Sequence, residues 1–443
     1  MDLIVALYWL LALILCVMMF AQGMTRKVDL FSIRNIYLCG FIVSQIISPA
    51  LALQTDNYHL FHIVDPMKAG RWLLLFNYVF VAIFLLSYHR FKFADRLAGK
   101  FPKGSGQASD SLLTTLAVVT IVAAAAIRLV GMRIPAITAI SIATSLALAS
   151  VGCAIMGWVW AARRVNPAVL SVSGIVLITG MMISLSGHYS RRPLISVLAG
   201  FAWGVYHRWV KKLSPSMMMV GTVPLVLVVG LIVAAFTAIR SHETSTTEAG
   251  ATVQQMKNAN ISKGTSDLLG GQAVGPAALW ILDSFPHKHE YRPLFGLKYM
   301  VYWWVPRVMW QDKPEPLSTE IATLARLRGV NRKGITLPPG VIGYAGAEGG
   351  FYAVVVYAIF FGQFTRFFDA LVRLNPTNPF IILPVGCSTG QFLGLARGDI
   401  STFATLAVVG FVSSYLLIYL TSVLFGNPSS ESPASAPLPH PRY

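Results

Sequence analysis

The first hydrophobic run of the chain extends from Leu3 to Gln22 and reads LIVALYWLLALILCVMMFAQ, without one charged side chain. A bilayer core about 30 Å thick needs about 20 apolar residues per spanning helix, so this run predicts a transmembrane helix. A cleaved signal peptide would carry basic residues ahead of its apolar region, whereas only Asp2 is charged there. We therefore expect a retained span.

Ten further apolar runs satisfy the same length rule, which predicts an all-α integral membrane protein with about 11 transmembrane helices. The expected spans are residues 3–22, 36–53, 72–88, 111–130, 135–161, 168–186, 193–207, 217–239, 350–365, 379–396 and 400–425. They divide the chain into an N-terminal bundle of about eight helices (1–239), one large loop (240–349), C-terminal helices (350–426) and a tail (427–443). The tail is rich in proline and serine and is expected to be disordered.

The composition excludes an ordinary cytosolic enzyme. Hydrophobic residues make up 55% and charged residues 12% of the 443 residues, whereas a soluble domain carries roughly 25% charged residues. The 35 Lys and Arg residues outnumber the 18 Asp and Glu residues, for a formal net charge of +17. In a membrane protein this excess indicates basic cytoplasmic loops rather than nucleic-acid binding. The four cysteines lie in apolar runs, which argues against a disulfide framework or a Cys-ligated metal.

The basic residues also predict an orientation. One set of alternate connections holds sixteen Lys and Arg residues, and the short loops of the other set hold seven. The first set is therefore expected on the cytoplasmic side, with the carboxyl terminus. The amino terminus and the large loop from Arg240 to Glu348 are expected on the extracytoplasmic side.

The second half of the large loop is the first place where we expect chemistry. Eight aromatic residues lie between Phe285 and Trp310, interleaved with Arg, Lys and His. Such a pattern suits a ligand with sugar faces for stacking and a phosphate to neutralise. It equally suits an amphipathic segment lying in the membrane interface, and one segment can do both.

Arginines on the expected outer side form a second group of candidates. Arg191 and Arg192 lie in the short turn 186–193, where they would clamp a diphosphate or an acidic sugar, or else bind lipid headgroups. Arg240 and Arg397 end spans and could simply extend to the interface. Arg397 could also pair locally with Asp399.

A glycine-rich stretch from Gly340 to Gly350 contains one carboxylate, Glu348, at the start of an expected span. Glycines permit close backbone approach to a ligand or a helix. Glu348 could act as a general base with a raised pKa, or it could cap the helix that follows.

Several signatures of other functions are missing from the sequence. There is no phosphate-binding loop of the G-x-x-x-x-G-K-[S/T] type and no H-E-x-x-H zinc motif. His287 and His289 have i, i+2 spacing, which makes a metal site only a minor alternative. The first outer loop has isolated Asp56 and Asp65 but no paired acidic motif. We therefore expect no metal and no cofactor, and chemistry based on Arg and Lys.

In these features the chain resembles the Wzy-type polymerases of bacterial O-antigen and exopolysaccharide repeat units, and it is similar in topology to the O-antigen ligases. The resemblance rests on Pro306-Arg-Val-Met-Trp-Gln-Asp-Lys-Pro314, on the Gly340–Gly350 stretch with Glu348, on the turn at Arg191 and Arg192, and on Ala396-Arg-Gly-Asp399. It covers about a third of the chain. It implies a GT-C-like helical scaffold in the bacterial inner membrane, with an active site that faces the periplasm.

The activity that this resemblance implies is metal-independent, inverting glycosyl transfer. The donor would be a glycan on undecaprenyl diphosphate and the acceptor the next lipid-linked repeat unit; membrane lipid, a chain-length regulator and a flippase are implied partners, and nucleic acid is not. Candidate bases are Glu348, His289 and His287. Candidates to neutralise the diphosphate are Arg191, Arg192, Arg240, Arg292, Arg307 and Arg397. Candidates to stack on sugar rings are Tyr302, Trp303 and Trp304.

Two other functions remain open at this point. A ligase would use the same donor site but transfer finished glycan to a lipid A core. A transporter or flippase for lipid-linked sugars would place charged groups at mid-membrane on broken helices. The expected spans are nearly free of charge, apart from Arg128 near a span end, which favours catalysis at the outer surface.

Overall fold

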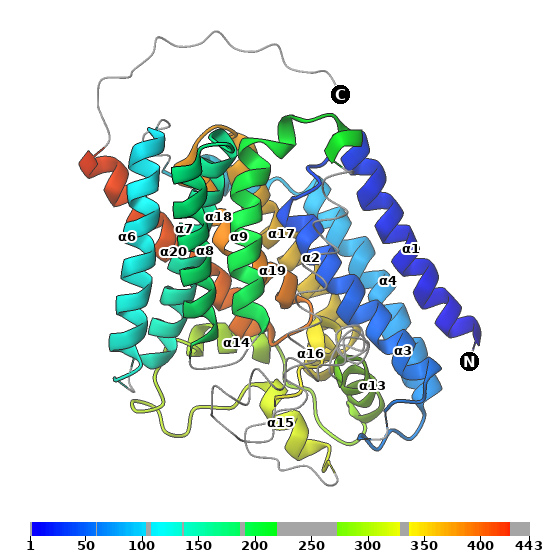
Figure 1. The fold of residues 1–443 in the computed structure, drawn as a ribbon. Coiled ribbons are helices and arrows are strands. Elements are labelled where there is room, and N and C mark those ends of the chain that lie inside the picture. The colour runs from blue at the N-terminus through cyan, green and yellow to red at the C-terminus, as the bar shows by residue number, and fades with distance from the viewer. Residues whose placement is uncertain are drawn as a thin grey trace, which may run out of the picture.

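The computed structural model describes residues 2–58, 60–102, 108–134, 137–186, 191–218, 273–327 and 336–425. Every regular element in these ranges is helical, which confirms the all-α prediction (Figure 1). Eight helical segments among them are long and apolar enough to cross a membrane: Leu3–Met24, Ile33–Gln54, Pro66–Arg90, Asp110–Gly131, Ile140–Ala162, Pro167–Leu185, Phe351–Leu374 and Ile400–Thr421. The chain is therefore built as an integral membrane protein.

The helices follow in chain order, with two short non-α elements. The first half contains α1 (Asp2–Met24), α2 (Ile33–Phe41), the π-helix η1 (Ile42–Ile47), α3 (Ser48–Gln54), α4 (Pro66–Arg90), α5 (Phe93–Gly99), α6 (Asp110–Gly131), α7 (Thr138–Ala162), α8 (Pro167–Leu185), α9 (Arg191–Arg208) and the 3₁₀-helix η2 (Val210–Lys212). The second half contains α13 (Val274–Ser284), α14 (Phe295–Tyr302), α15 (Leu317–Leu324), α16 (Gly340–Gly349), α17 (Phe351–Leu374), α18 (Pro379–Cys387), α19 (Thr389–Leu395) and α20 (Ile400–Phe425).

Three of the eleven expected spans have no equivalent among these eight. The run at 193–207 forms α9, which packs on α7. This helix is 18 residues long and also includes Arg191, Arg192 and Arg208. The run at 379–396 is divided into α18 and α19, which meet at Ser388. The span expected at 217–239 lies almost wholly outside the described residues.

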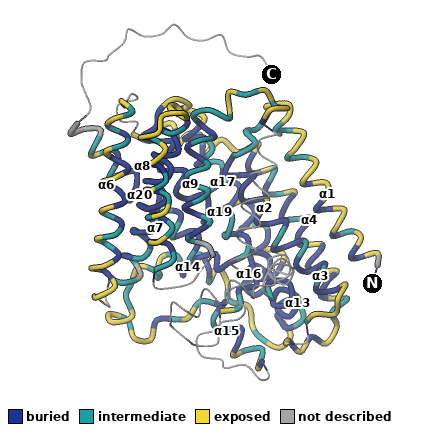
Figure 2. The backbone as a smooth tube through the Cα atoms, viewed as in Figure 1, coloured by how far each residue is buried: buried dark blue, intermediate teal, exposed yellow. Residues whose placement is uncertain are grey.

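The outer faces of the peripheral helices are apolar, as a lipid-facing surface requires. Figure 2 shows many exposed residues along α1, α6 and α8 and mostly buried residues through the middle of the bundle. On α8, for example, Ile175, Ile178 and Met182 are all at least 60% exposed. Their exposure is explained by contact with hydrocarbon, because a water-facing surface rarely carries such a large apolar patch.

Close backbone packing joins α7 to α9. A Cβ atom placed on Gly204 of α9 would lie 2.0 Å from the carbonyl oxygen of Ala154 and 2.7 Å from the amide nitrogen of Trp158. Small residues at a helix crossing let two backbones approach, which strengthens van der Waals contact where the hydrophobic effect between helices is weak. One neighbour, Trp203, donates its Nε1 hydrogen to the carbonyl oxygen of Ile382 at 2.8 Å and so links α9 to α18.

The π-helix η1 places a buried amide where several elements meet. Gln45 donates to the carbonyl oxygen of Ala396 at 3.0 Å and accepts from the amide of Ile342 at 3.4 Å. Its own carbonyl oxygen accepts from the Asn77 side chain at 2.9 Å. Gln45 thereby links the second span to α4, to α16 and to the residues that follow α19.

The described part of the large loop gathers at one end of the bundle. Figure 1 shows α13, α14, α15 and α16 at the same end as the start of α1, whereas α20 ends at the opposite end. The helix α14 packs on α20, and α13 packs on α3, α4 and α16. This end of the bundle carries most of the residues that the sequence identified as functional candidates.

The close contact between α7 and α9 gives a test of the packing. We expect Gly204→Ala to lower the apparent melting temperature of the detergent-solubilised protein, because overpacking typically destabilises by about 1–3 kcal/mol. Gly174→Ala is the matched control, because a Cβ there meets nothing within 4 Å and alanine is favoured over glycine in helices by up to about 1 kcal/mol. Equal melting temperatures for the two variants would contradict the close crossing.

Candidate functional site

Glu348 is the buried acidic group at the centre of the candidate site. It lies near the end of α16, before Gly350 adopts a φ of +58° and α17 begins at Phe351. The residue is only 2% exposed. Its Oε1 accepts from the amide of Gly296 at 2.8 Å, and its Oε2 accepts from the hydroxyl of Tyr357 at 2.7 Å.

These contacts contradict the expectation that Glu348 caps the next helix. The N-cap of α17 is Gly350, and no side-chain hydrogen bond caps it. Instead, the carboxylate links three helices, because Gly296 belongs to α14 and Tyr357 to α17. A buried carboxylate needs such donors, since an unpaired charge away from water is strongly unfavourable.

The surroundings of Glu348 raise its pKa to about 7. Burial is the main cause, because it disfavours the charged form, and the nearby charge of Asp399 acts in the same direction. The hydrogen bonds from Tyr357 and Gly296 and the charge of Lys298 oppose the rise. A carboxyl group with a pKa near neutrality can take up and release a proton under physiological conditions, as a general base must.

The absence of a side chain at Gly296 allows α14 to lie against this carboxylate. A Cβ atom there would stand 2.7 Å from the Tyr357 hydroxyl and 2.9 Å from Oε1 of Glu348. A second contact lies just before α14, where the amide of Arg292 donates to the carbonyl oxygen of Ala347 at 3.1 Å. The segment 292–296 therefore covers Glu348 from the loop side.

A second buried carboxylate, Asp399, lies close enough to affect the pKa of Glu348. Its Oδ2 accepts from the Ser318 hydroxyl at 3.0 Å, and its Oδ1 accepts from the amide of Thr402 at 3.2 Å and from the Ser401 hydroxyl. The amide of Ser318 donates to the Tyr344 hydroxyl at 3.2 Å. Asp399 thus ties α15 to the start of α20, a role that its position in the sequence beside Arg397 did not reveal.

Two of the candidate arginines, Arg292 and Arg307 of the large loop, form ion pairs with glutamates. Arg292 pairs with Glu320 of α15, and Arg307 lies 3.5 Å from Glu315 and donates to the carbonyl oxygen of Lys313 at 3.2 Å. Both arginines are at least partly exposed. They hold the loop together, and they still face solvent with part of their guanidinium surface.

Lys313 organises the chain between α14 and α15. Its Nζ donates to the carbonyl oxygens of Trp303 at 3.2 Å and Val305 at 3.0 Å, and it lies 5.4 Å from the centre of the Tyr299 ring. The residue is 8% exposed, and burial together with the charge of Arg307 lowers the pKa of its amine. The sequence did not predict the burial of Lys313, because a lysine in a polar loop carries no sign of burial.

The predicted sugar-stacking aromatics pack partly on one another. Trp303 meets Trp304 edge to face with ring centres 5.6 Å apart, and Tyr302 meets Trp310 in the same way at 5.3 Å. Trp304 is 45% exposed, and Val308 and Met309 beside it are more than 70% exposed. This exposed apolar surface favours contact with the membrane interface, while the exposed face of Trp304 leaves room for a sugar.

The described contacts of the two candidate histidines do not include Glu348. His289 packs against the rings of Phe285 and Trp280, with ring centres 5.2 and 5.7 Å away. Burial lowers its pKa, and the charges of Arg292, Lys288 and Arg326 lower it further, so the imidazole is neutral near pH 7. His287 is exposed. In the residues that the structure describes, no hydrogen bond joins either imidazole to Glu348.

The remaining candidates are placed less completely. Arg191 and Arg192 form the first turn of α9, at the end of the bundle that carries α14, but their side chains lie outside the described part (Figure 1). Arg240 lies outside the described residues altogether. Arg397 is half-buried between α19 and α20, two residues before Asp399.

Comparison with known proteins adds no relative to this description. No protein family, no curated protein and no solved structure matches the chain.

The hydrogen bond between Tyr357 and Glu348 predicts the effect of removing the hydroxyl. Tyr357→Phe should raise the pKa of Glu348 above about 7, because the lost donor stabilised the charged carboxylate. The carboxyl stretching band in infrared spectra, recorded between pH 5 and 9 and assigned with Glu348→Gln, would report the titration. Tyr352→Phe on the same helix is the control, since Tyr352 is 83% exposed. An unchanged or lower midpoint in Tyr357→Phe would refute the interaction.

Proposed function

We propose that this protein polymerises undecaprenyl-diphosphate-linked oligosaccharide repeat units by metal-independent, inverting glycosyl transfer at the outer face of the bacterial inner membrane. The observation that carries the proposal is the buried carboxyl of Glu348, with a pKa of about 7, beneath a loop rich in aromatic and basic residues. The scaffold would be GT-C-like. A flippase and a chain-length regulator would be the partners of the enzyme.

Glu348 is the proposed general base. The acceptor hydroxyl attacks the anomeric carbon of the donor sugar, the bond from that carbon to the diphosphate oxygen breaks, and the hydroxyl proton passes to Glu348. Each carboxylate oxygen accepts one hydrogen bond and retains a second lone pair for the incoming hydroxyl. Because segment 292–296 covers Glu348, the acceptor reaches the carboxylate only when this segment moves aside. His289, which is neutral near pH 7, is the alternative base, and His287 is a third.

Arginines would stabilise the diphosphate as it leaves. Negative charge develops on its oxygens as the glycosidic bond breaks, and preorganised guanidinium groups are well suited to stabilise it. Arg292 and Arg307 pair with the carboxylates of Glu320 and Glu315, so a diphosphate would compete with these carboxylates. Arg191 and Arg192 start α9, where unpaired backbone amides also favour an anion. Arg240 and Arg397 complete the proposed set.

The aromatic segment would position the sugars and the lipid. Tyr302 ends α14, and Trp303 and Trp304 follow it, so all three lie on the same stretch of chain as the residues that cover Glu348. In the proposal their rings stack on the glycan, while the exposed Val308 and Met309 lie in the outer leaflet. A lipid-linked substrate would then present its diphosphate at the level of the arginines.

Variants of the two partners in the Arg292–Glu320 ion pair distinguish a catalytic role of Arg292 from a structural one. We expect Arg292→Ala to lower polymer formation by about 100-fold or more, the loss typical of a group that stabilises transition-state charge. Glu320→Gln breaks the same ion pair but leaves the guanidinium, so it should retain most activity. The assay uses purified protein, EDTA, and lipid-linked repeat units extracted from cells that lack this gene.

Three results of that assay would count against the proposal. Equal loss in Arg292→Ala and Glu320→Gln would assign Arg292 a purely structural role. Full activity in Arg292→Ala would remove it from the diphosphate site. Activity that disappears with EDTA and returns with Mg²⁺ or Mn²⁺ would refute metal independence.

The surface glycan of cells without the gene distinguishes polymerase, ligase and transporter. We expect a gel of extracted glycan to lose its ladder while a single repeat unit remains attached to the lipid A core. Long polymer retained on the lipid carrier, with none on the core, would indicate a ligase. An unchanged pattern would contradict both the polymerase and the ligase, and would favour a transporter or a role with a different glycan.

A further inference from the structure

A basic hollow lies at the end of the bundle opposite to Glu348. The chain leaves α4 at Arg90 and enters α5 at Phe93, and α17 lies alongside. The hollow between them has a volume of about 610 Å³ and opens to the surface. Besides Ile359 of α17, the residues that line it are Arg90, Phe91, Lys92, Phe93, Arg96 and Gln363.

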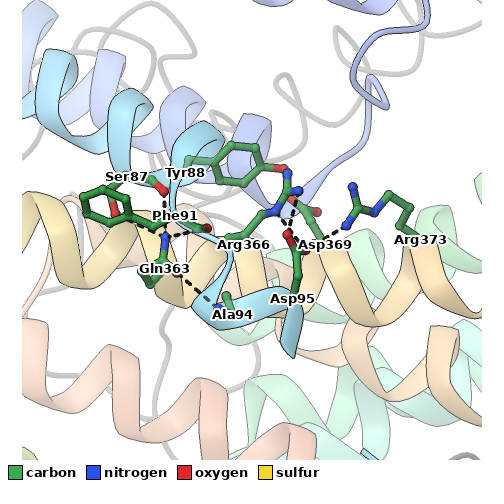
Figure 3. Close-up of polar contacts among 9 residues, drawn as sticks. All are labelled: Ser87, Tyr88, Phe91, Ala94, Asp95, Gln363, Arg366, Asp369 and Arg373. Atoms are coloured by element: carbon green, nitrogen blue, oxygen red, sulfur yellow. Dashed lines mark hydrogen bonds and ion pairs between the residues drawn. The ribbon is translucent and has the colours of Figure 1, made fainter. Parts of the chain in front are cut away.

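Polar contacts fix the short helix α5 against α17, as Figure 3 shows. The amide of Ala94 donates to Oε1 of Gln363 at 3.2 Å, and Nε2 of Gln363 donates to the carbonyl oxygen of Ser87 at 2.6 Å. Asp95 accepts two hydrogen bonds from Arg366, at 3.1 and 3.0 Å. The walls of the hollow are therefore held in place by polar side chains, of which Gln363 also lines the hollow.

The charges around the hollow are not balanced. Asp95 is the only acidic residue between Arg90 and Lys100, and it is already paired with Arg366 and, at 2.7 Å, with Arg373. Arg90, Lys92 and Arg96 are exposed, and within the described ranges no ion pair or side-chain hydrogen bond involves any of them. Three cations thus surround one hollow without a counter-ion from the described part of the chain.

Apolar side chains share this short segment with the cations. Phe91 is 46%, Phe93 63% and Leu97 45% exposed, whereas Ala94 and Ala98 are buried. Aromatic rings next to basic side chains at the end of a transmembrane helix are typical of the boundary between headgroups and acyl chains. A soluble anion would use the cations but not the rings, so the combination fits a lipid.

We propose that this hollow binds the anionic headgroup of a membrane phospholipid. Arg90, Lys92 and Arg96 neutralise the phosphate and any second acidic group, and Phe91 and Phe93 contact the glycerol and the upper acyl chains. The excess of basic residues in the connections at this end assigns it to the cytoplasmic leaflet, whose lipids attract basic segments. The proposal is independent of the reaction at the other end of the bundle.

The test measures lipid binding to the full chain in a neutral detergent. Phosphatidylglycerol and phosphatidylcholine are added at equal concentration, and native mass spectrometry counts the molecules of each that remain bound. We expect the wild-type protein to retain phosphatidylglycerol preferentially. Combining Arg90→Gln, Lys92→Gln and Arg96→Gln should lower that preference at least about fivefold, the equivalent of one surface cation acting on an anionic lipid.

Two matched variants keep the result interpretable. Arg163→Gln, Arg164→Gln and Lys212→Gln together remove the same charge from the same end of the bundle, and this variant should keep the preference. Arg90→Lys, Lys92→Arg and Arg96→Lys keep the charge and should also keep it. An unchanged preference in the first triple variant, or an equal loss in the Arg163, Arg164 and Lys212 variant, would overturn the proposal. Displacement of the lipid by millimolar inorganic phosphate would assign the hollow to a free anion instead.

Discussion

The hydrocarbon of a bilayer offers no partner to a peptide group, and this constraint organises the described structure. Every backbone amide and carbonyl inside the membrane must be satisfied by the protein, so the spanning segments are helices. Side chains that carry polar groups into the bundle need partners for the same reason. Gln45 meets the requirement at the π-helix, where it bonds to the backbone at Ala396 and Ile342. This one amide fixes α16 and the residues after α19 to the second span, and thereby positions the elements around Glu348.

The fold was predictable from the sequence to the extent that single helices follow from local composition. Apolar length identified the eight spans, because each needs only its own residues to satisfy its backbone. It also predicted a span at 193–207, where α9 forms with arginines at both of its ends, and one span at 379–396, which the structure divides at Ser388. The short helices α13 to α16 were not predicted, since their boundaries depend on contacts with the bundle that composition does not encode.

The candidate site shows the same limit at the level of individual residues. Glu348 was identifiable, as a lone carboxylate in an apolar, glycine-rich stretch must either be exposed or find donors. Its donors were not identifiable. Gly296 lies 52 residues away, and Tyr357 lies nine residues away across the break at Gly350, a spacing that no single helix brings together. The burial of Asp399 and Lys313 and the pairing of Arg292 and Arg307 with glutamates were not predicted, because both depend on tertiary proximity.

The burial that raises the pKa of Glu348 also closes the group to a substrate, and the two effects are physically linked. A charged carboxylate is a stronger hydrogen-bond acceptor than a neutral carboxyl group, so the bond from the Gly296 amide is stronger above pH 7 than below it. Apart from this bond, the described backbone hydrogen bond between segment 292–296 and α16 is the one that the Arg292 amide donates to the carbonyl oxygen of Ala347. Protonation of Glu348 therefore weakens the hydrogen bond by which α16 keeps segment 292–296 over Glu348. In the proposed reaction the segment has moved aside before the base takes up its proton, so the neutral carboxyl group would draw it back less strongly until that proton is lost.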